Sequence, residues 1–357
     1  MKKSSQWNEL MRDTMDRQGA SLEDLPAPAA GRAGWPWTTS VKPCETTLPD
    51  GAPWPRISVI TPSFNQGAYL EETLRSVLLQ GYPNLEYIVM DGGSTDDSVE
   101  TIRRYEPWLS YWISTRDGGQ PHALNQGFDR ASGTLLGSIN SDDLLEPGAL
   151  RLLGLAHHAK PAAILLGDVI NFDEETGMSW CVRQQNVNFD AMSQPWRHAV
   201  TWHQPGTWFP HAVFQRIGPF DESLRYLFDW DWMCRALPVA PAHHVAGAVA
   251  RFRYHGRSKT VGESSSWRHE KVILIRRYWP RRVGDDPTLS LAVLEFVVST
   301  DKMVYQSFAR REAIAHLWRA LRYDARVLAW SRYWVAWCKA LLPESVLQFS
   351  RMLMRGF

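Results

Sequence analysis

From Arg56 onward, short apolar runs alternate with stretches in which apolar residues recur every three or four positions. The runs Ile57–Ile60, Leu85–Met90 and Leu135–Ile139 are typical of buried strands, and Tyr111–Ser114 predicts a further short strand. Strands that alternate with helices predict an α/β fold with a parallel sheet and right-handed crossovers. The helices are predicted between consecutive strands, at 70–78, 98–105 and 123–131.

The same patterning divides the chain into three parts. Residues 1–52 are polar and then rich in Pro, Ala and Gly, which predicts an extension or linker. Residues 53–262 carry the strands and helices, with a first half at 53–165 and a second half at 166–262. Residues 263–357 are basic, rich in tryptophan and helical in pattern, so we expect a helical tail.

The second half repeats these signals more weakly. Strands are predicted at Ile164–Leu166, Val169–Phe172 and Val245–Phe252, and an acidic, hairpin-like loop is predicted at Asp173–Gly177. A helix is predicted at 229–237. Together with the first half, these elements make a domain that is large enough to bury a substantial core.

The tail combines an apolar stripe with arginines. Its apolar residues recur at helical spacing, which predicts amphipathic helices. Such a face either lies on an anionic membrane surface, where tryptophan favours the interface, or packs on the preceding α/β domain or a second copy of the chain. The stripe consists of Ile314, Leu317, Trp318, Leu321, Trp330, Trp334, Trp337 and Leu341.

Composition narrows the class of protein. The 357 residues are 44% hydrophobic and 22% charged, as in ordinary globular proteins, and a net charge of +1 argues against nucleic-acid binding. The four cysteines are far apart, without disulfide or metal-ligand spacing. The sequence shows no signal peptide and no apolar run of the ~20 residues that a membrane span needs. We therefore expect a cytoplasmic protein, either free or peripheral on the inner face of the cell membrane.

Polar side chains follow each of the four strands of the first half. Asn65, Asp91, Asp117 and Asp142 stand after successive strands. The carboxyl ends of parallel strands meet at one edge of a sheet, so these side chains converge although they are distant in sequence. Each one alone is at least as typical of a polar turn, and Asp91 alone more typical of a turn that is stabilised by Asx hydrogen bonds.

The fourth strand ends in two adjacent acids, Asp142 and Asp143. Their charges repel, and the pair becomes tolerable if it holds a divalent cation together with a phosphate group. The alternative is a polar turn in which one of the two acids caps the helix that begins near Pro147. No Gly-x-Gly-x-x-Gly follows the first strand, which disfavours a dinucleotide-binding oxidoreductase.

Four motifs, in this order, resemble those of the family 2 glycosyltransferases. They are Ile57–Asn65, Tyr87–Asp96, Asp117–Gly127 and Gly133–Asp143, and the similarity covers residues 55–260. The resemblance implies the GT-A fold, in which a Rossmann-like nucleotide-sugar half joins an acceptor half. The predicted fold class is therefore α/β of the GT-A type, with a C-terminal helical extension.

The resemblance also implies a donor site for a nucleotide sugar. Thr61 and Pro62 lie against the nucleotide base in this interpretation, and Asp91 accepts a hydrogen bond from it. Asp117 lies at the diphosphate and sugar end of the donor. The two remaining donor residues from the matching motifs are Asn65 and Asn125.

A metal site is implied at 140–142, which matches the family's Asp-x-Asp motif. Asp142 becomes the ligand of Mn²⁺ or Mg²⁺, and Asn140 lies near the ribose. Asn140 departs from the commonest pattern, and its neutral amide brings one negative charge fewer, so weaker metal affinity is expected. Further along, Arg253 is expected to close over the diphosphate and His255 to bind the metal, although a lone histidine after a strand is more often simply packed.

The catalytic base is implied within Phe228–Arg235. By similarity to the family's acidic motif, which has an arginine six residues on, Asp229 is the general base. Asp229 and Asp231 point to different faces of a helix, so Asp231 is expected to be structural. The alternative for Asp229 is a carboxylate that caps the helix at 229–237.

Taken together, the expected activity is inverting and metal-dependent. A sugar passes from a nucleotide donor, for which the family suggests UDP, to a hydroxyl of a glycan or lipid-linked acceptor in polysaccharide or glycolipid assembly. The Gln-x-x-Arg-Trp signature of processive synthases is absent, which favours transfer of a single sugar. The alternatives are a non-catalytic sugar-nucleotide-binding scaffold and a sugar-1-phosphate nucleotidyltransferase, whose Gly-rich phosphate loop is missing after the first strand.

Overall fold

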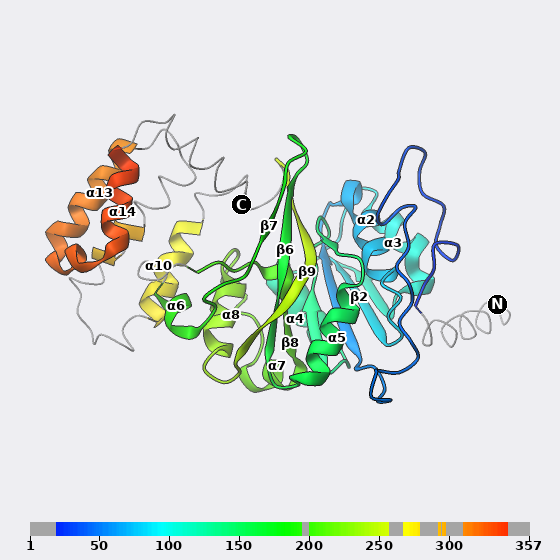
Figure 1. Cartoon of the computed structure of the whole chain (residues 1–357). Helices are drawn as coiled ribbons and strands as arrows, with labels where there is room; N and C mark the ends of the chain where they lie inside the picture. Colours follow the sequence, from blue (N-terminus) through cyan, green and yellow to red (C-terminus); the bar gives the residue numbers. More distant parts are fainter. Residues whose placement is uncertain are drawn as a thin grey trace. The chain divides into compact units, whose positions relative to one another are not determined.

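The computed structural model describes residues 19–194, 200–256, 267–278, 292–293, 295–297 and 310–341. These residues belong to two compact units (Figure 1). The first unit contains the described residues up to Gln184 and Trp202–Arg253. The second contains those in Gln185–Thr201 and from Tyr254 onward.

A nine-stranded mixed sheet forms the centre of the first unit. Its parallel half follows the order β3 (Tyr111–Ser114), β2 (Leu85–Asp91), β1 (Ile57–Ser63), β4 (Leu135–Ser138). The strand order reverses beside β1, and ligands of open α/β sheets bind at such a switch point, outside the carboxyl ends of the strands. The sheet therefore places the predicted donor loops along one edge.

Antiparallel strands extend the sheet beyond β4. The order continues through β8 (Thr207–Pro210), β6 (Ile164–Asp173), β9 (Ala242–Tyr254) and β5 (Leu144–Leu145). A short strand, β7 (Ser179–Val182), pairs with β6 as a hairpin. This arrangement brings the end of β9 close to the chain that leaves β4, because β5 directly follows the acidic loop and pairs with β9.

Helices cover both faces of the parallel half. The apolar faces of α2 (Gly67–Leu78) and α3 (Ser98–Tyr105) share one buried cluster with alternate residues of β1 and β2. Helix α4 (Gln120–Arg130) packs on the opposite face, where a Cβ at Gly127 would lie 2.6 Å from a methyl group of Ile60. The helix approaches the strand this closely because the residue is glycine. The first unit is completed by α5 (Ala149–Ala159), α7 (His211–Ile217), α8 (Phe228–Ala236) and 3₁₀ turns at Glu106–Trp108 and Gln204–Gly206.

The segment at 19–56 contains no helix or strand, yet it packs against the first unit. Leu25, Trp37, Leu48 and Trp54 are buried there. The guanidinium of Arg75, on α2, is completely buried beneath this segment. It donates hydrogen bonds to three of its carbonyl oxygens, those of Pro26, Pro36 and Trp37.

The second unit is helical. It contains α6 (Phe189–Ser193), α10 (Trp267–Tyr278), α13 (Arg310–Tyr323) and α14 (Ser331–Leu341), with a 3₁₀ turn at Ala325–Ala329. No helix in the part of the chain that the structure describes combines the length and apolarity needed to cross a bilayer.

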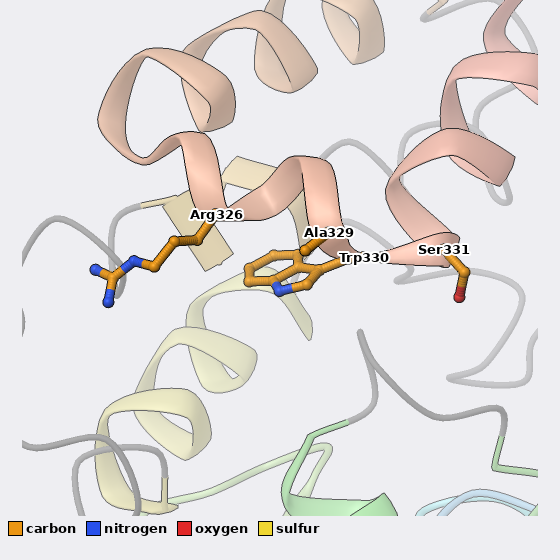
Figure 2. A pocket seen from close by; sticks show the side chains of 4 residues that line it. All are labelled: Arg326, Ala329, Trp330 and Ser331. Atoms are coloured by element: carbon orange, nitrogen blue, oxygen red, sulfur yellow. The ribbon is translucent and has the colours of Figure 1, made fainter.

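The predicted apolar stripe is divided between core and surface in this unit. Leu317, Trp330 and Tyr333 are buried in a shared cluster, whereas Trp318 and Trp334 are 55% and 52% exposed. A pocket beside the buried Trp330 is lined by Arg326, Ala329, Trp330 and Ser331 (Figure 2). None of these four residues belongs to the predicted site.

Candidate active site

Asn65 joins the loops that follow β1 and β2. Its backbone N–H donates to Ser94 Oγ at 2.8 Å, and its Oδ1 accepts from the N–H of Thr95 at 2.9 Å. Asn65 has a positive φ of 52°, a conformation that asparagine tolerates better than most residues. The side chain therefore holds the first two loops of the edge against each other.

Asp91 organises the next pair of loops. This carboxylate is 2% exposed, and it accepts from Ser94 N–H at 2.9 Å and from Ser114 Oγ, at the end of β3, at 2.7 Å. Asp117 lies beside it, since a Cβ at Gly92 would be 3.1 Å from Asp117 Oδ2. A side chain at position 92 would therefore press on Asp117 where the two loops approach each other.

Thr61 and Pro62, the predicted base contacts, are buried at the end of β1. The hydroxyl of Thr61 shares a hydrogen bond of 2.9 Å with the hydroxyl of Tyr87 on β2. Burial raises the pKa of Tyr87, so this tyrosine stays neutral and the contact is a hydrogen bond between two hydroxyls. This hydrogen bond links the side chains of β1 and β2 beneath the predicted donor loops.

The acidic loop after β4 is held by its neighbours. Gln120 Nε2, at the start of α4, donates to Asn140 Oδ1 at 2.8 Å. Asn140 Nδ2 donates in turn to Asp143 Oδ2 at 3.2 Å, and the N–H of Arg253 donates to Asp143 Oδ1 at 2.9 Å. Burial, with the charge of Asp142 as the second cause, raises the pKa of Asp143. Asp143 is thus the internal carboxylate of the loop, and Asp142 is the half-buried one.

The loop residues fit a metal that binds together with its nucleotide. Across the described ranges, no three side chains of His, Cys, Asp or Glu gather into a metal cage. Asp143 and Asn140 use their oxygens for hydrogen bonds within the protein, and the role of Asp142 as metal ligand stays a prediction. Mg²⁺ and similar ions are commonly held by one or two carboxylates plus substrate phosphates, so one carboxylate is sufficient. His255 belongs to the second unit, directly after β9, and its metal role stays a prediction.

Arg253 makes a different set of contacts from the one predicted. Its side chain is 5% exposed, and its guanidinium donates to Glu72, Glu174 and the carbonyl oxygen of Asp142. The group that we expected to close over a diphosphate is therefore engaged by protein acceptors in this structure.

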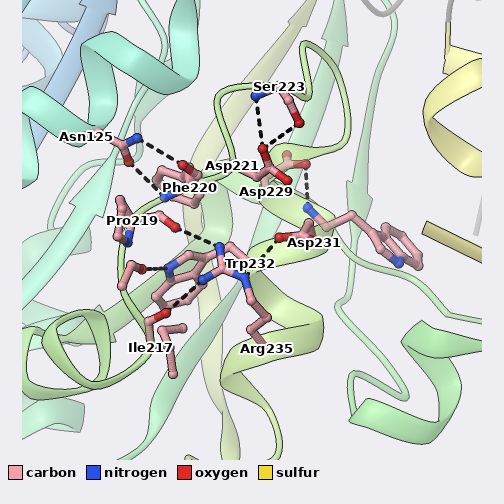
Figure 3. A network of polar contacts seen from close by, with 12 residues as sticks. Asn125, Ile217, Pro219, Phe220, Asp221, Ser223, Asp229, Asp231, Trp232 and Arg235 are labelled. Atoms are coloured by element: carbon pink, nitrogen blue, oxygen red, sulfur yellow. Dashed lines mark hydrogen bonds and ion pairs between the residues drawn. The ribbon is translucent and has the colours of Figure 1, made fainter. Parts of the chain in front are cut away.

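Asn125 is likewise engaged inside the protein (Figure 3). Its Oδ1 accepts from Phe220 N–H at 2.8 Å, and its Nδ2 donates to Phe220 O at 3.0 Å and to Glu222 Oε1 at 2.9 Å. The side chain is buried. Asn125 thus ties α4 to the segment that leads into α8, and these contacts are structural.

Helix α8 carries Asp229 and Asp231, the two acids of the predicted catalytic motif (Figure 3). Asp231 is buried and paired with Arg235 at 3.0 Å, and Arg235 also donates to the carbonyl oxygens of Ile217 and Pro219. These contacts anchor the helix on the preceding loop. Asp231 accordingly has the structural surroundings that we expected.

Asp229 lies in the first turn of α8 and is half-buried. Its Oδ1 accepts from the N–H of Trp230 at 2.7 Å. The N-cap of the helix is Leu227, so the alternative role of Asp229 as the helix cap is wrong. Asp229 is two residues before Asp231, so the helix presents this carboxylate on a different face from the pair formed by Asp231 and Arg235.

Sequence reasoning missed the residues that hold the loops in place. Gln120, Glu72 and Glu174 were not among the predicted site residues, although each contacts one that was. The acidic loop at 173–177 gave the one available signal, since Glu174 belongs to it. The other two occupy helical positions whose partners are distant in sequence.

The parallel half, the switch point beside β1 and the acidic loop after β4 are features of the GT-A fold. The crystal structure of TarS from S. aureus in complex with UDP-GlcNAc has this fold, with a TM-score of 0.56 and 17% sequence identity over 80% of this chain and 88% of that one. The predicted GT-A fold is confirmed.

Residues 58–216 match the family model described as Glycosyl transferase family 2. A PGL/p-HBAD biosynthesis glycosyltransferase of Mycobacterium bovis is 28% identical over 247 residues, which cover 64% of this chain and 93% of that protein. An uncharacterized glycosyltransferase of Rickettsia prowazekii is 27% identical over 214 residues, covering 58% of this chain and 66% of that protein. These matches support a family 2 glycosyltransferase, the family whose motifs the sequence resembles.

Proposed function

We propose that this glycosyltransferase moves a single sugar, with inversion, from a UDP-sugar to a hydroxyl of a glycan or lipid-linked acceptor in polysaccharide or glycolipid assembly. One observation carries the proposal: hydrogen bonds and close contacts join the loops after β1, β2, β3 and β4 in sequence. Asp91, Asp117 and Asp142 therefore share one edge. TarS is crystallised with UDP-GlcNAc on the same fold, and the mycobacterial relative is named for PGL/p-HBAD biosynthesis.

The reaction needs a neutralised leaving group and a base. Mn²⁺ or Mg²⁺, held by Asp142 and the donor diphosphate, would act as the Lewis acid that stabilises the departing nucleotide. Asp229 takes the proton from the acceptor hydroxyl as the new bond to the anomeric carbon forms. A single base on the face opposite the leaving group produces one displacement, and hence inversion. Thr61 and Asp91 orient the nucleoside, and Asp117 lies near the diphosphate and sugar.

The second unit is proposed to meet a partner through its exposed aromatic residues. Trp318 and Trp334 stand out of the helical core, and Leu341 is exposed beyond them. The candidates are the anionic inner face of the cell membrane and a second copy of the chain. Sedimentation with phosphatidylglycerol vesicles supports the first, and a dimer mass by light scattering without vesicle binding supports the second.

Donor binding and turnover test the assignment. UDP and GDP binding is measured by calorimetry with and without Mn²⁺, and release of nucleotide from UDP- and GDP-sugars reports turnover. We expect Asp142→Ala to lose Mn²⁺-dependent binding at least tenfold. Asp229→Asn should bind normally and turn over about 100-fold more slowly, the lower range for a general base. The control is Asp129→Asn, an exposed carboxylate on α4.

The same measurements separate the alternatives. Nucleotide-sugar binding without turnover in the wild type would support the scaffold interpretation. Release of pyrophosphate from a nucleoside triphosphate and a sugar 1-phosphate would support the nucleotidyltransferase. Either result would overturn the proposed function.

A further inference from the structure

Arg253 occupies a site built from three other parts of the first unit. Its Nη2 donates to Glu72 Oε2 on α2 at 2.8 Å, and its Nη1 donates to Glu174 Oε1, just after β6, at 3.1 Å. Its Nε donates to the carbonyl oxygen of Asp142 at 2.8 Å. Every nitrogen of the buried guanidinium therefore has an acceptor. A planar guanidinium with several fixed donors suits such a junction, whereas a lysine ammonium does not.

Aromatic rings enclose the same group. The guanidinium carbon lies 5.0 Å from the ring centre of Tyr69 and 4.7 Å from that of Phe172. Contacts at these distances stabilise a cation, especially away from water. The Tyr69 hydroxyl also donates to the second oxygen of Glu174 at 3.2 Å. The ion pairs and the rings thus hold Arg253 in one orientation.

The backbone of Arg253 completes the link to the acidic loop. Its N–H donates to the Asp143 carboxylate at 2.9 Å, while its side chain binds the Asp142 carbonyl oxygen. Both acids of the loop are therefore bound by one residue of β9. Because the backbone fixes the Cα–Cβ direction of Asp142, this double contact restricts the positions that the Asp142 carboxylate can reach.

We propose that Arg253 is a positioning residue, which fixes Asp142 for the metal and donor, and that Glu72 and Glu174 are its anchors. The inference rests on the proposed role of Asp142 as metal ligand. It replaces the expectation that Arg253 binds the diphosphate directly, because a guanidinium that turned to the donor would leave two carboxylates without their cation. Residues that orient a metal ligand typically change metal affinity by about 10- to 100-fold when they are altered.

The two roles predict opposite results when the anchors are removed. Under the positioning role, Glu72→Gln and Glu174→Gln loosen Arg253 and raise the Mn²⁺ concentration needed for UDP binding about tenfold. If Arg253 is a direct ligand, the same substitutions release it from competing carboxylates, so UDP binding stays unchanged or becomes tighter. That second result would overturn the proposal.

Matched controls are available beside each anchor. Glu71→Gln removes the neighbouring charge on α2, which pairs with Arg104 and Tyr105 instead. Glu175→Gln removes an exposed charge from the same hairpin turn as Glu174. Both controls should keep the Mn²⁺ requirement within twofold of the wild type. UDP titrations at a series of Mn²⁺ concentrations supply the readout, with melting temperatures recorded for every variant.

A double variant separates positioning from general loss of structure. In an Asp142→Ala background, Glu72→Gln should cause no additional loss of Mn²⁺-dependent UDP binding, because the group that it positions is gone. An equal further loss there would show that the substitution acts through the fold and would overturn the inference. If the wild type binds neither UDP nor GDP with Mn²⁺, the proposed function fails and this inference falls with it. Normal wild-type binding with unaffected anchor variants overturns the inference alone.

Discussion

Asn125 is the residue for which a role in binding the nucleotide sugar and a structural role predict the most different results. Its amide makes one acceptor contact and two donor contacts, all to the segment that precedes α8. Asn125→Ala removes all three. Asn125→Asp keeps the size and the contact with Phe220 N–H, but it turns the other two contacts into oxygen–oxygen contacts of 3.0 and 2.9 Å.

The expected loss of stability follows from these contacts. Three hydrogen bonds contribute about 1 kcal/mol each, and the buried N–H and C=O of Phe220 lose their partner at an added cost. We expect Asn125→Ala to lower the free energy of unfolding by about 3–5 kcal/mol. Asn125→Asp should lower it at least as much, because a buried carboxylate would face two acceptor oxygens. An isosteric change is then no milder than a truncation.

Urea unfolding followed by tryptophan fluorescence measures the free energy, with UDP binding and turnover recorded in parallel. Because the affected segment leads into α8, turnover should fall while UDP affinity changes less than threefold. The control is Gln126→Ala, the next residue on α4. A loss below about 1 kcal/mol for Asn125→Ala, together with UDP binding weakened tenfold, would refute the structural role and restore Asn125 to the donor site.

Two further predictions concern stability. Arg75→Met leaves three carbonyl oxygens of the 19–56 segment and the Tyr105 hydroxyl without their buried donor. We therefore expect about 3–5 kcal/mol of destabilisation and faster limited proteolysis within that segment. Cleavage at the wild-type rate would contradict this prediction. Burial lowers the pKa of His203 to about 4, so the unfolded chain binds a proton between about pH 6.5 and 4 that the folded chain excludes. The stability that the neutral, buried histidine contributes is fully present above about pH 6.5 and is lost as the pH falls toward about 4. Because the side chain is partly exposed, we expect this contribution to the free energy of unfolding to be about 2 kcal/mol. His203→Gln should flatten the acid side of the stability profile, and an equally steep decline in the variant would show that other groups cause it.

The local pattern of apolar and polar residues predicted most elements of the first unit, because its strands and helices are short and strongly periodic. The helix at Ser98–Tyr105 and the strand at Tyr111–Ser114 have the predicted bounds. The predicted strands at 164–166 and 169–172 form the single strand β6. Gly167 and Asp168 interrupt the apolar run there but not the backbone pairing. A Cβ at Gly167 would lie 2.4 Å from Val249 on β9, so the glycine serves packing rather than a turn.

The candidate site was predictable where topology alone brings residues together. Asp91 and Asp117 meet because parallel strands end at one edge, and the alternation of strands and helices already indicates parallel strands. The partners of Asn125 and Arg253 were not predictable, because they lie 79 to 181 residues away in the chain. No local spacing encodes such pairs. In the tail, periodicity predicted the helices, but only the packing between them decides that Trp330 is buried and Trp334 exposed.

The amide at Asn140 has an evolutionary consequence. It accepts from Gln120 on one side and donates to Asp143 on the other, which an aspartate cannot do while it is ionised. Restoring the commoner acid at position 140 would set two carboxylates 3.2 Å apart, unless Asp143 changed as well. A second metal-binding charge at position 140 is therefore expected to need a compensating change at position 143, so the identities of the two residues depend on each other.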